Sequence, residues 1–168
     1  MQIPLATYWM AAAESGYAKP SDWRSWADQI ILVMPHPPIW IIDMAVAEDV
    51  DGLAKALNDR RFVEGLAEGR SREASETEFE EIVVGYFWLR FRKNEIALSE
   101  CLWLAAWRSD AYQLDFSWGE LLELRSLLQD GSPSAPIDLH VKQILGNLGE
   151  LAQRQWDTII NTTIVESA

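Results

Sequence analysis

The sequence predicts an all-α domain, an irregular (orthogonal) bundle of about seven or eight helices. Apolar residues recur at three- and four-residue spacing through most of the chain, which is typical of amphipathic helices. No stretch alternates polar and apolar residues as a strand would, and no segment repeats at a fixed period. A chain of 168 residues suits a single domain and can bury a core without disulfides or metals.

The densest apolar runs, residues 82–89 and 101–107, flank a short charged break at residues 92–95. A helix that is apolar around most of its circumference must be covered on all sides. We therefore expect a central helical hairpin with the other helices packed around it. Its mostly buried side chains would be Val83, Phe87, Trp88, Leu102, Trp103 and Trp107. Truncation of Trp103 to alanine would then cost about 3–5 kcal/mol.

The N-terminal part is predicted to start with a short helix over residues 5–13, which are rich in good helix formers. A second helix follows, with Ser21 or Asp22 as its N-cap. Its predicted core face carries Trp23, Trp26, Ile30 and Val33. Three prolines within residues 35–38 end it. Residues 39–44 are expected to form a short buried helix, with a strand as the alternative because several are β-branched.

Asp49 is expected to cap the next helix, which ends near Asn58. Residues 62–76 are rich in glutamate and poor in apolar side chains, so we expect a poorly ordered acidic connection there. Thr77, followed three residues later by Glu80, matches a capping box for the first central helix.

The second central helix is expected over residues 95–111, and three of its apolar side chains fall on one line: Ile96, Trp103 and Trp107. Ser117 with Glu120 is another capping-box pattern and predicts a further helix. Residues 130–136, which contain glycine, serine and two prolines, are the clearest loop.

The last helix is predicted to begin near Ile137 and to carry a long apolar stripe. Gly146 and Gly149 would each weaken it by about 1 kcal/mol relative to alanine, unless another helix packs closely there. Residues 162–168 are expected to form a frayed tail.

The chain has 14 basic and 26 acidic residues, a net charge of −12. Such a surface repels nucleic acids and anionic lipids but attracts a basic protein; alternatively, the acids serve only solubility. No apolar run approaches the about 20 residues that span a bilayer. With one cysteine, Cys101, expected as a buried free thiol, and no cleavable leader after Met1, we expect a cytoplasmic location.

Residues for catalysis or metal binding are scarce. The two histidines, His36 and His140, are far apart in sequence, and neither a cysteine pair nor a phosphate-binding glycine loop occurs. We therefore expect no catalytic residue, no metal and no cofactor. Tryptophan pairs at helical spacing, Trp23 with Trp26 and Trp103 with Trp107, are expected to fill the core; a Trp-lined ligand pocket is the alternative.

Two acidic stretches without a basic residue are the predicted partner-binding site. The first lies between residues 43 and 51 and the second between residues 73 and 81. Their acids are Asp43, Glu48, Asp49, Asp51, Glu73, Glu76, Glu78, Glu80 and Glu81. Acids near the start of helices also favour the helix dipole, which is the structural alternative. If they do not bind, exposed parts of the Trp40 and Trp118 regions are the next candidates.

In overall character, a small, acidic, Trp-rich helical chain without catalytic residues resembles bacterial immunity proteins. That resemblance implies a tight cytoplasmic complex with one cognate toxin domain, whose basic active-site surface is occluded. Three other function classes remain open. They are an acidic, nucleic-acid-mimicking regulator, a small-molecule-binding protein or enzyme with a Trp-lined pocket, and an oligomeric structural subunit.

Overall fold

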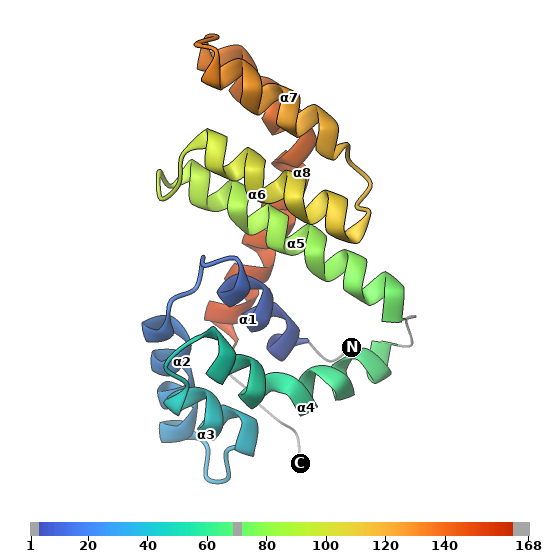
Figure 1. Ribbon diagram of the computed structural model, residues 1–168. Coiled ribbons are helices and arrows are strands. Elements are labelled where there is room, and N and C mark those ends of the chain that lie inside the picture. Colours follow the sequence, from blue (N-terminus) through green and yellow to red (C-terminus); the bar gives the residue numbers. More distant parts are fainter. Residues whose placement is uncertain (1–3, 69–71, 163–168) are drawn as a thin grey trace. The chain divides into compact units, whose positions relative to one another are not determined.

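The computed structural model describes residues 4–68 and 72–162, and it describes side chains there except at 66–74. The prediction of an all-α fold is confirmed: this part of the chain forms eight helices and no strand (Figure 1). The helices are α1 (Leu5–Glu14), α2 (Pro20–Val33), α3 (Ile39–Val46), α4 (Val50–Glu68), α5 (Arg72–Arg92), α6 (Leu98–Tyr112), α7 (Trp118–Gln129) and α8 (Ser134–Asn161).

The helices group into two compact units. The first unit contains α1 to α4 and the last turns of α8, from Gln155 onward. The second unit, Glu73–Arg154, contains nearly all of α5, then α6, α7 and most of α8. The two units are described separately below.

Tryptophans form the core of the first unit. The ring centroid of Trp9 lies 5.5 Å from that of Trp26 and 5.8 Å from that of Trp156, and Trp26 in turn stacks on Trp40. Trp23 is fully buried, and its indole N–H donates a hydrogen bond to the carbonyl oxygen of Ala47 at 2.9 Å. A buried indole loses little when its N–H finds an acceptor, as those of Trp23 and Trp26 do. The buried indole N–H groups of Trp9 and Trp40 have no hydrogen-bond partner among the described residues.

Glu64 of α4 caps the start of α1 from a distant point in the sequence. Its buried carboxylate accepts hydrogen bonds from the backbone N–H groups of Ala6 and Thr7, at 3.1 and 3.0 Å. Arg60, one turn earlier on α4, donates to the same carboxylate at 3.2 Å. Because Pro4 offers α1 no side-chain cap, these bonds satisfy N–H groups that the helix itself leaves free.

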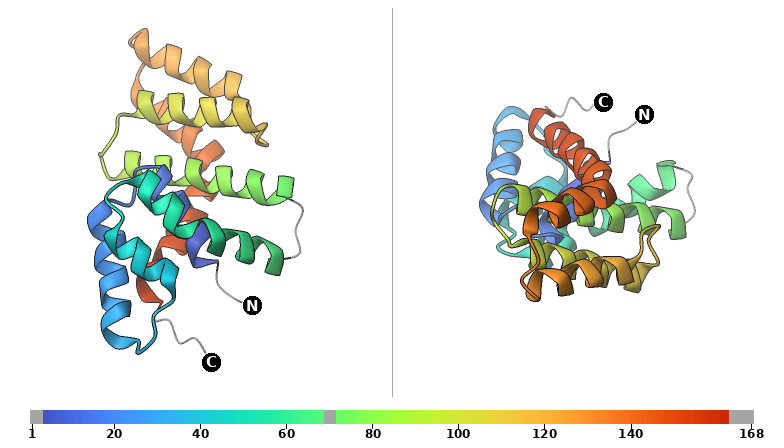
Figure 2. Two further views of the ribbon diagram at one scale, coloured as in Figure 1. Left: turned by 60° about the horizontal axis from the view of Figure 1, so that its bottom comes forward. Right: turned by 90° about the horizontal axis from the view of Figure 1, so that it is seen from above.

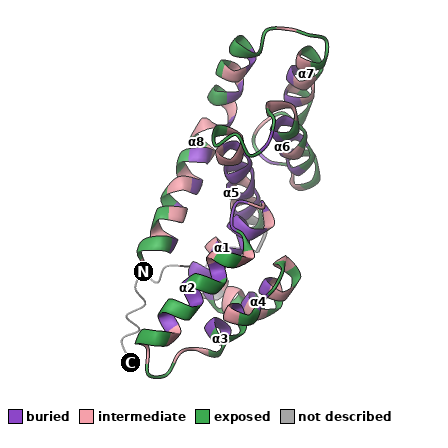
Figure 3. Ribbon diagram, turned by 90° about the vertical axis from the view of Figure 1, so that its left-hand side faces the viewer, coloured by how far each residue is buried: buried purple, intermediate pink, exposed green. Residues whose placement is uncertain are grey.

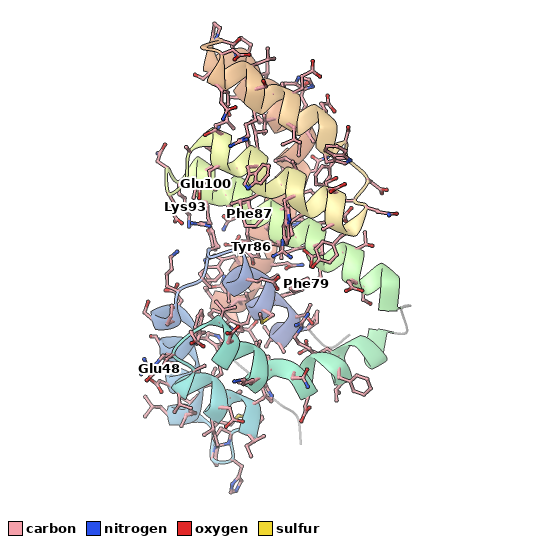
Figure 4. The ribbon with its side chains drawn as sticks, in the orientation of Figure 1. Glu48, Phe79, Tyr86, Phe87, Lys93 and Glu100 are labelled. Atoms are coloured by element: carbon pink, nitrogen blue, oxygen red, sulfur yellow. The ribbon has the colours of Figure 1, made fainter. Side chains whose placement is uncertain are left out.

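In the second unit, α5 is buried along most of its length (Figure 3). Phe79, Tyr86 and Phe87 lie along it and are all buried (Figure 4). Helix α8 crosses α5 at two glycines (Figure 2). A Cβ atom on Gly85 would lie 2.2 Å from the carbonyl oxygen of Leu148, and one on Gly149 would lie 2.3 Å from the Trp88 ring. Close packing therefore explains Gly149, as the sequence suggested it could.

Three predicted capping residues have different outcomes. Ser117 caps α7 as predicted, since its Oγ accepts a hydrogen bond from the N–H of Glu120 at 3.3 Å. The predicted capping box at Thr77 is wrong, because α5 already begins at Arg72. The predicted N-cap of α2, Ser21 or Asp22, is wrong by two or three residues: Lys19 is the N-cap, and Pro20 takes the first helical position.

The predicted connections are shorter than expected. Within residues 62–76, α4 continues to Glu68 and α5 starts at Arg72, and residues 69–71 lie outside the described part. Within the predicted loop 130–136, α8 already starts at Ser134, because a proline is tolerated in the first turn of a helix. Of the predicted tail, residues 163–168 also lie outside the described part. Residues 39–46 are helical, so the alternative of a strand there is wrong.

Candidate functional site

The first group of predicted partner-binding acids lies in the first unit. Asp43 is exposed on α3, and Glu48 (Figure 4), Asp49 and Asp51 are exposed where α4 begins. Asp49 has the structural role that the sequence suggested, because its carboxylate accepts a hydrogen bond from the N–H of Gly52 at 2.7 Å. All four carboxylates face solvent and are accessible to a partner.

The second group lies on α5, in the second unit, and its members differ in exposure. Glu76 is exposed, Glu78 and Glu81 are half-buried, and Glu80 is buried. The side chain of Glu73 lies outside the described residues. The two acidic groups therefore belong to different units, and one member of the second group faces the interior.

Glu80 is a correction to the predicted binding site. Its side chain is only 3% exposed and forms an ion pair with Arg108 of α6, which is 7% exposed. The guanidinium group of Arg108 also lies over the rings of Trp107 and Tyr112, at 5.4 and 5.7 Å from their centroids. A buried carboxylate that neutralises a buried arginine holds α5 and α6 together and is not available to a partner.

Glu81 lies in an unfavourable electrostatic environment. Partial burial raises the pKa of its carboxyl group above the ordinary value of 4.5, and the nearby carboxylate of Asp115 raises it further. Both causes disfavour the charged form. A basic group brought close to Glu81 would relieve this cost.

Trp103 and Trp107 of α6 contradict the prediction that they are buried. Trp103 is 48% exposed and Trp107 is 53% exposed, whereas Val83, Phe87, Trp88 and Leu102 are buried as predicted. The inner face of α6 carries small side chains, which let the helix approach its neighbours closely and leave the large rings outside. The buried small residues are Cys101, Ala105, Ala106 and Ser109.

Carboxylates flank the two exposed tryptophans on the same face of α6. Glu100 (Figure 4) precedes Trp103 by three residues and Asp110 follows Trp107 by three residues, and both acids are exposed. Residues three and four apart are neighbours on a helix surface. We call Glu100, Trp103, Trp107 and Asp110 the tryptophan ridge. The guanidinium group of Arg125 on α7 lies 5.1 Å from the Trp103 ring centroid and supports that ring.

The other tryptophans singled out above are either buried or partly exposed. Trp40 is buried, while Trp118 is about half exposed at the start of α7. Trp23 lies in the core, and Trp26 borders an open groove beside Leu32 and Val33.

The described side chains contain no cluster suited to binding a metal ion. Across residues 4–65 and 75–162, no group of three or more His, Cys, Asp or Glu side chains could hold one. The Nε2 atom of His140 lies 2.9 Å from the Oε1 atom of Glu120. His36 is exposed in the turn before α3. Cys101 is a buried free thiol, as predicted, and burial raises its pKa to about 12. A thiol with that pKa is a poor nucleophile at neutral pH.

Known proteins offer no guide to the function. No protein-family model matches the chain, and no similar curated protein or solved structure was found. Among the described helices, none combines the length and apolar character needed to cross a membrane. The functional argument therefore rests on the surfaces described above.

Proposed function

We propose that this protein is a non-catalytic inhibitor that binds a basic protein, in the manner of a bacterial immunity protein that neutralises a cognate toxin. The tryptophan ridge is the proposed anchor of the contact. One observation carries this proposal: α6 holds two tryptophans half-exposed between two exposed carboxylates on a single face. The basic active-site surface of a toxin that acts on nucleic acid or nucleotides would be the occluded partner surface.

The chemistry of the ridge fits a partner that carries lysine or arginine. Tryptophan is the residue type most enriched among the side chains that dominate binding energy at interfaces. An indole face attracts a cation, and the flanking carboxylates of Glu100 and Asp110 can pair with further basic groups. Arg125 already holds the Trp103 ring in place in the free protein. Binding therefore loses less side-chain conformational entropy at Trp103.

The predicted acids outside the ridge are assigned a steering role. Asp43, Glu48, Asp49, Asp51, Glu76, Glu78 and Glu81 belong to this group, together with Glu73. The net charge of −12 raises the rate at which a basic partner meets the chain, and salt screens this effect. Glu80 is excluded because it is buried against Arg108. The buried free thiol of Cys101 is compatible with the reducing cytoplasm, where we propose that the complex forms.

A direct test starts with the tagged full-length chain as bait in a lysate of the source cell, followed by purification of the captured protein. The supporting result is a partner whose activity or toxicity disappears in the complex. Trp103→Ala together with Trp107→Ala should then weaken binding at least about 100-fold, since anchors of this kind are worth about 2 kcal/mol or more each. Leu139→Ala, at an exposed site on α8, is the matched control.

Three outcomes would each contradict part of this proposal. Catalytic turnover by the isolated chain would refute a purely inhibitory role. Unchanged affinity of the double tryptophan variant, with its fold intact by far-UV circular dichroism, would remove the ridge from the interface. Binding that is indifferent both to salt and to neutralisation of Asp43 and Glu48 would contradict the steering role.

A further inference from the structure

The first unit exposes a set of large aliphatic side chains on the hairpin of α2 and α3. Leu32 is 84% exposed and Ile39 is 76% exposed, on either side of the proline-rich turn. Val33, Ile42 and Val46 are exposed as well. We call these five residues the α2–α3 apolar surface. They are clustered on one supersecondary unit, whereas single exposed apolar residues are scattered over any protein.

Helix α3 has apolar side chains on both of its faces. Trp40, Ile41 and Met44 are buried against the rest of the first unit. Ile39, Ile42 and Val46 are spaced by three and four residues and form a second stripe, which faces solvent. A helix that is apolar on both faces is expected to be covered on both. None of the described residues of the first unit therefore covers the outer stripe of α3.

An open groove extends this surface toward the end of α8. It has a volume of about 370 Å³, and Leu32, Val33 and Ile160 stand exposed at its walls. Trp26 and Ile30 are its buried apolar residues. Gln29, Asn161 and Thr162 complete the lining, so none of the described residues that line the groove is charged. An apolar, uncharged groove between two helices suits the apolar side of a third helix.

The charged residues in the sequence around this surface are mostly acidic. From residue 25 to residue 54 the sequence has five acids and no lysine or arginine. Asp28, Asp43 and Glu48 are exposed on or beside the α2–α3 hairpin. Arg24, which precedes this stretch, donates its Nε–H to the carbonyl oxygen of Ala45 at 3.2 Å, and Arg60 of α4 lies over the buried Trp40 ring and pairs with Glu64. Among the described residues no base pairs with Asp28, Asp43 or Glu48, so a basic partner would match these carboxylates.

This charge distribution selects among the possible occupants. A second copy of the chain, pairing through the same surface, would bring identical carboxylates together, and like charges at an interface are unfavourable. An anionic lipid surface would be repelled for the same reason. A helix that carries an apolar stripe with lysine or arginine on either side matches both the apolar surface and its acidic rim.

We infer that the α2–α3 apolar surface binds a basic amphipathic helix of a partner protein. This site lies in the first unit, whereas the tryptophan ridge lies in the second, and it stands whether or not the ridge proves to be an interface. Ile39, Ile42 and Val46 contact the apolar stripe of the bound helix. Asp43 and Glu48 pair with its basic residues.

The probe for the test is a fluorescent synthetic helix of about 18 residues, or about five turns, with leucines along one face and lysines elsewhere. The comparison peptide has the same leucines and glutamate in place of lysine. Fluorescence anisotropy with the full chain should show binding of the lysine peptide only. Binding should weaken when salt is raised.

Substitutions then place the peptide on the surface. Ile39→Gln with Val46→Gln should weaken binding at least about tenfold, and Asp43→Asn with Glu48→Gln should weaken it mainly at low salt. Leu139→Gln, equally apolar and exposed but in the second unit, is the control and should leave binding unchanged. All these positions are exposed, so the fold should survive, which circular dichroism checks.

Several results would overturn the inference. Equal binding of the lysine and glutamate peptides, or no binding of either, removes the charge argument. Self-association in sedimentation equilibrium that Ile39→Gln and Val46→Gln abolish would assign the surface to a second copy. Loss of binding to phosphatidylserine-containing vesicles in the same variant would assign it to a membrane. Peptide binding that appears only after truncation behind Thr162 would identify the chain's own C-terminal end as the occupant.

Discussion

In the first unit, Trp23 and Trp26 are almost completely buried, and both indole N–H groups donate to backbone carbonyl oxygens. In the second unit, Trp103 and Trp107 leave about half of their surface exposed, beside arginine side chains. Tryptophan therefore fills the core of the first unit and stands at the surface on α6 of the second, although Trp88 of the second unit is buried. The hydrophobicity of a side chain does not by itself determine its burial.

The side chains around each helix explain the difference. In the first unit the aromatic rings meet one another and fill the space between helices. On α6 the inner face consists largely of small residues such as Ala105 and Ala106, and close helix packing leaves no space for an indole. Four predictions test this contrast between buried and exposed copies of the same residue type.

The largest expected effect is that of Trp23→Ala compared with Trp103→Ala. Loss of the fully buried Trp23 should lower the free energy of unfolding by about 3–5 kcal/mol, because it leaves a cavity. Loss of the half-exposed Trp103 should cost about 1 kcal/mol, below the value expected from sequence alone. Chemical denaturation of both variants measures the difference, and equal losses would refute the contrast.

Glutamates provide the second matched pair. Glu80→Gln leaves the buried guanidinium of Arg108 without its countercharge and should cost about 3 kcal/mol. The exposed Glu76, one turn earlier on α5, should tolerate the same substitution within about 0.5 kcal/mol. Urea denaturation of the parent and of both variants would measure the two changes in the free energy of unfolding. A stable Glu80→Gln variant would mean that the ion pair contributes little to the packing of α5 against α6.

Glycines on α5 and α8 form the third pair. Gly85→Ala places a Cβ against the carbonyl oxygen of Leu148 and should destabilise the second unit by about 1–3 kcal/mol. Gly146→Ala meets only the Lys142 side chain at 3.5 Å, so it should stabilise α8 by about 1 kcal/mol. Shifts of opposite sign in the thermal midpoint are the expected result. A stabilising Gly85→Ala would show that the helices are farther apart at this crossing.

The smallest effect concerns Glu81 and pH. Because the pKa of its carboxyl group is raised above 4.5 in the folded chain, folding favours the protonated form. The charged carboxylate therefore lowers stability at neutral pH, and this penalty fades as the pH falls through the raised pKa toward 4.5. Glu81→Gln should be more stable than the parent at pH 7, and this difference should vanish near pH 4. Asp115→Asn should reproduce part of the gain.

The sequence predicted the helices well where capping residues or prolines mark their ends. Ser117 and Asp49 each cap the helix that was assigned to them. The sequence-based prediction failed between α4 and α5. There Glu64 stabilises α4 through hydrogen bonds from Thr7 and Ala6, which lie 57 and 58 positions away in the chain. A local excess of glutamate does not distinguish a solvated connection from a helix with one buried carboxylate.

For the candidate site, the sequence located exposed acids but missed the tryptophan ridge. Both faces of α6 are apolar, so periodicity could not decide whether Trp103 or Ala105 faces inward. Glu80 was assigned to the surface because its partner Arg108 lies 28 residues away in sequence. The contrast between large outer and small inner residues on α6 was the only available signal.

The bonds from Glu64 to α1 also have a consequence for the rate of amide hydrogen exchange. The N–H groups of Ala6 and Thr7 are protected by a carboxylate on α4, so their exchange requires separation of the two helices as well as fraying of α1. They should exchange with the kinetics of α4 and more slowly than the first amides of an ordinary helix. During synthesis, the start of α1 also remains uncapped until Glu64 has left the ribosome, which delays its protection until most of the first unit exists.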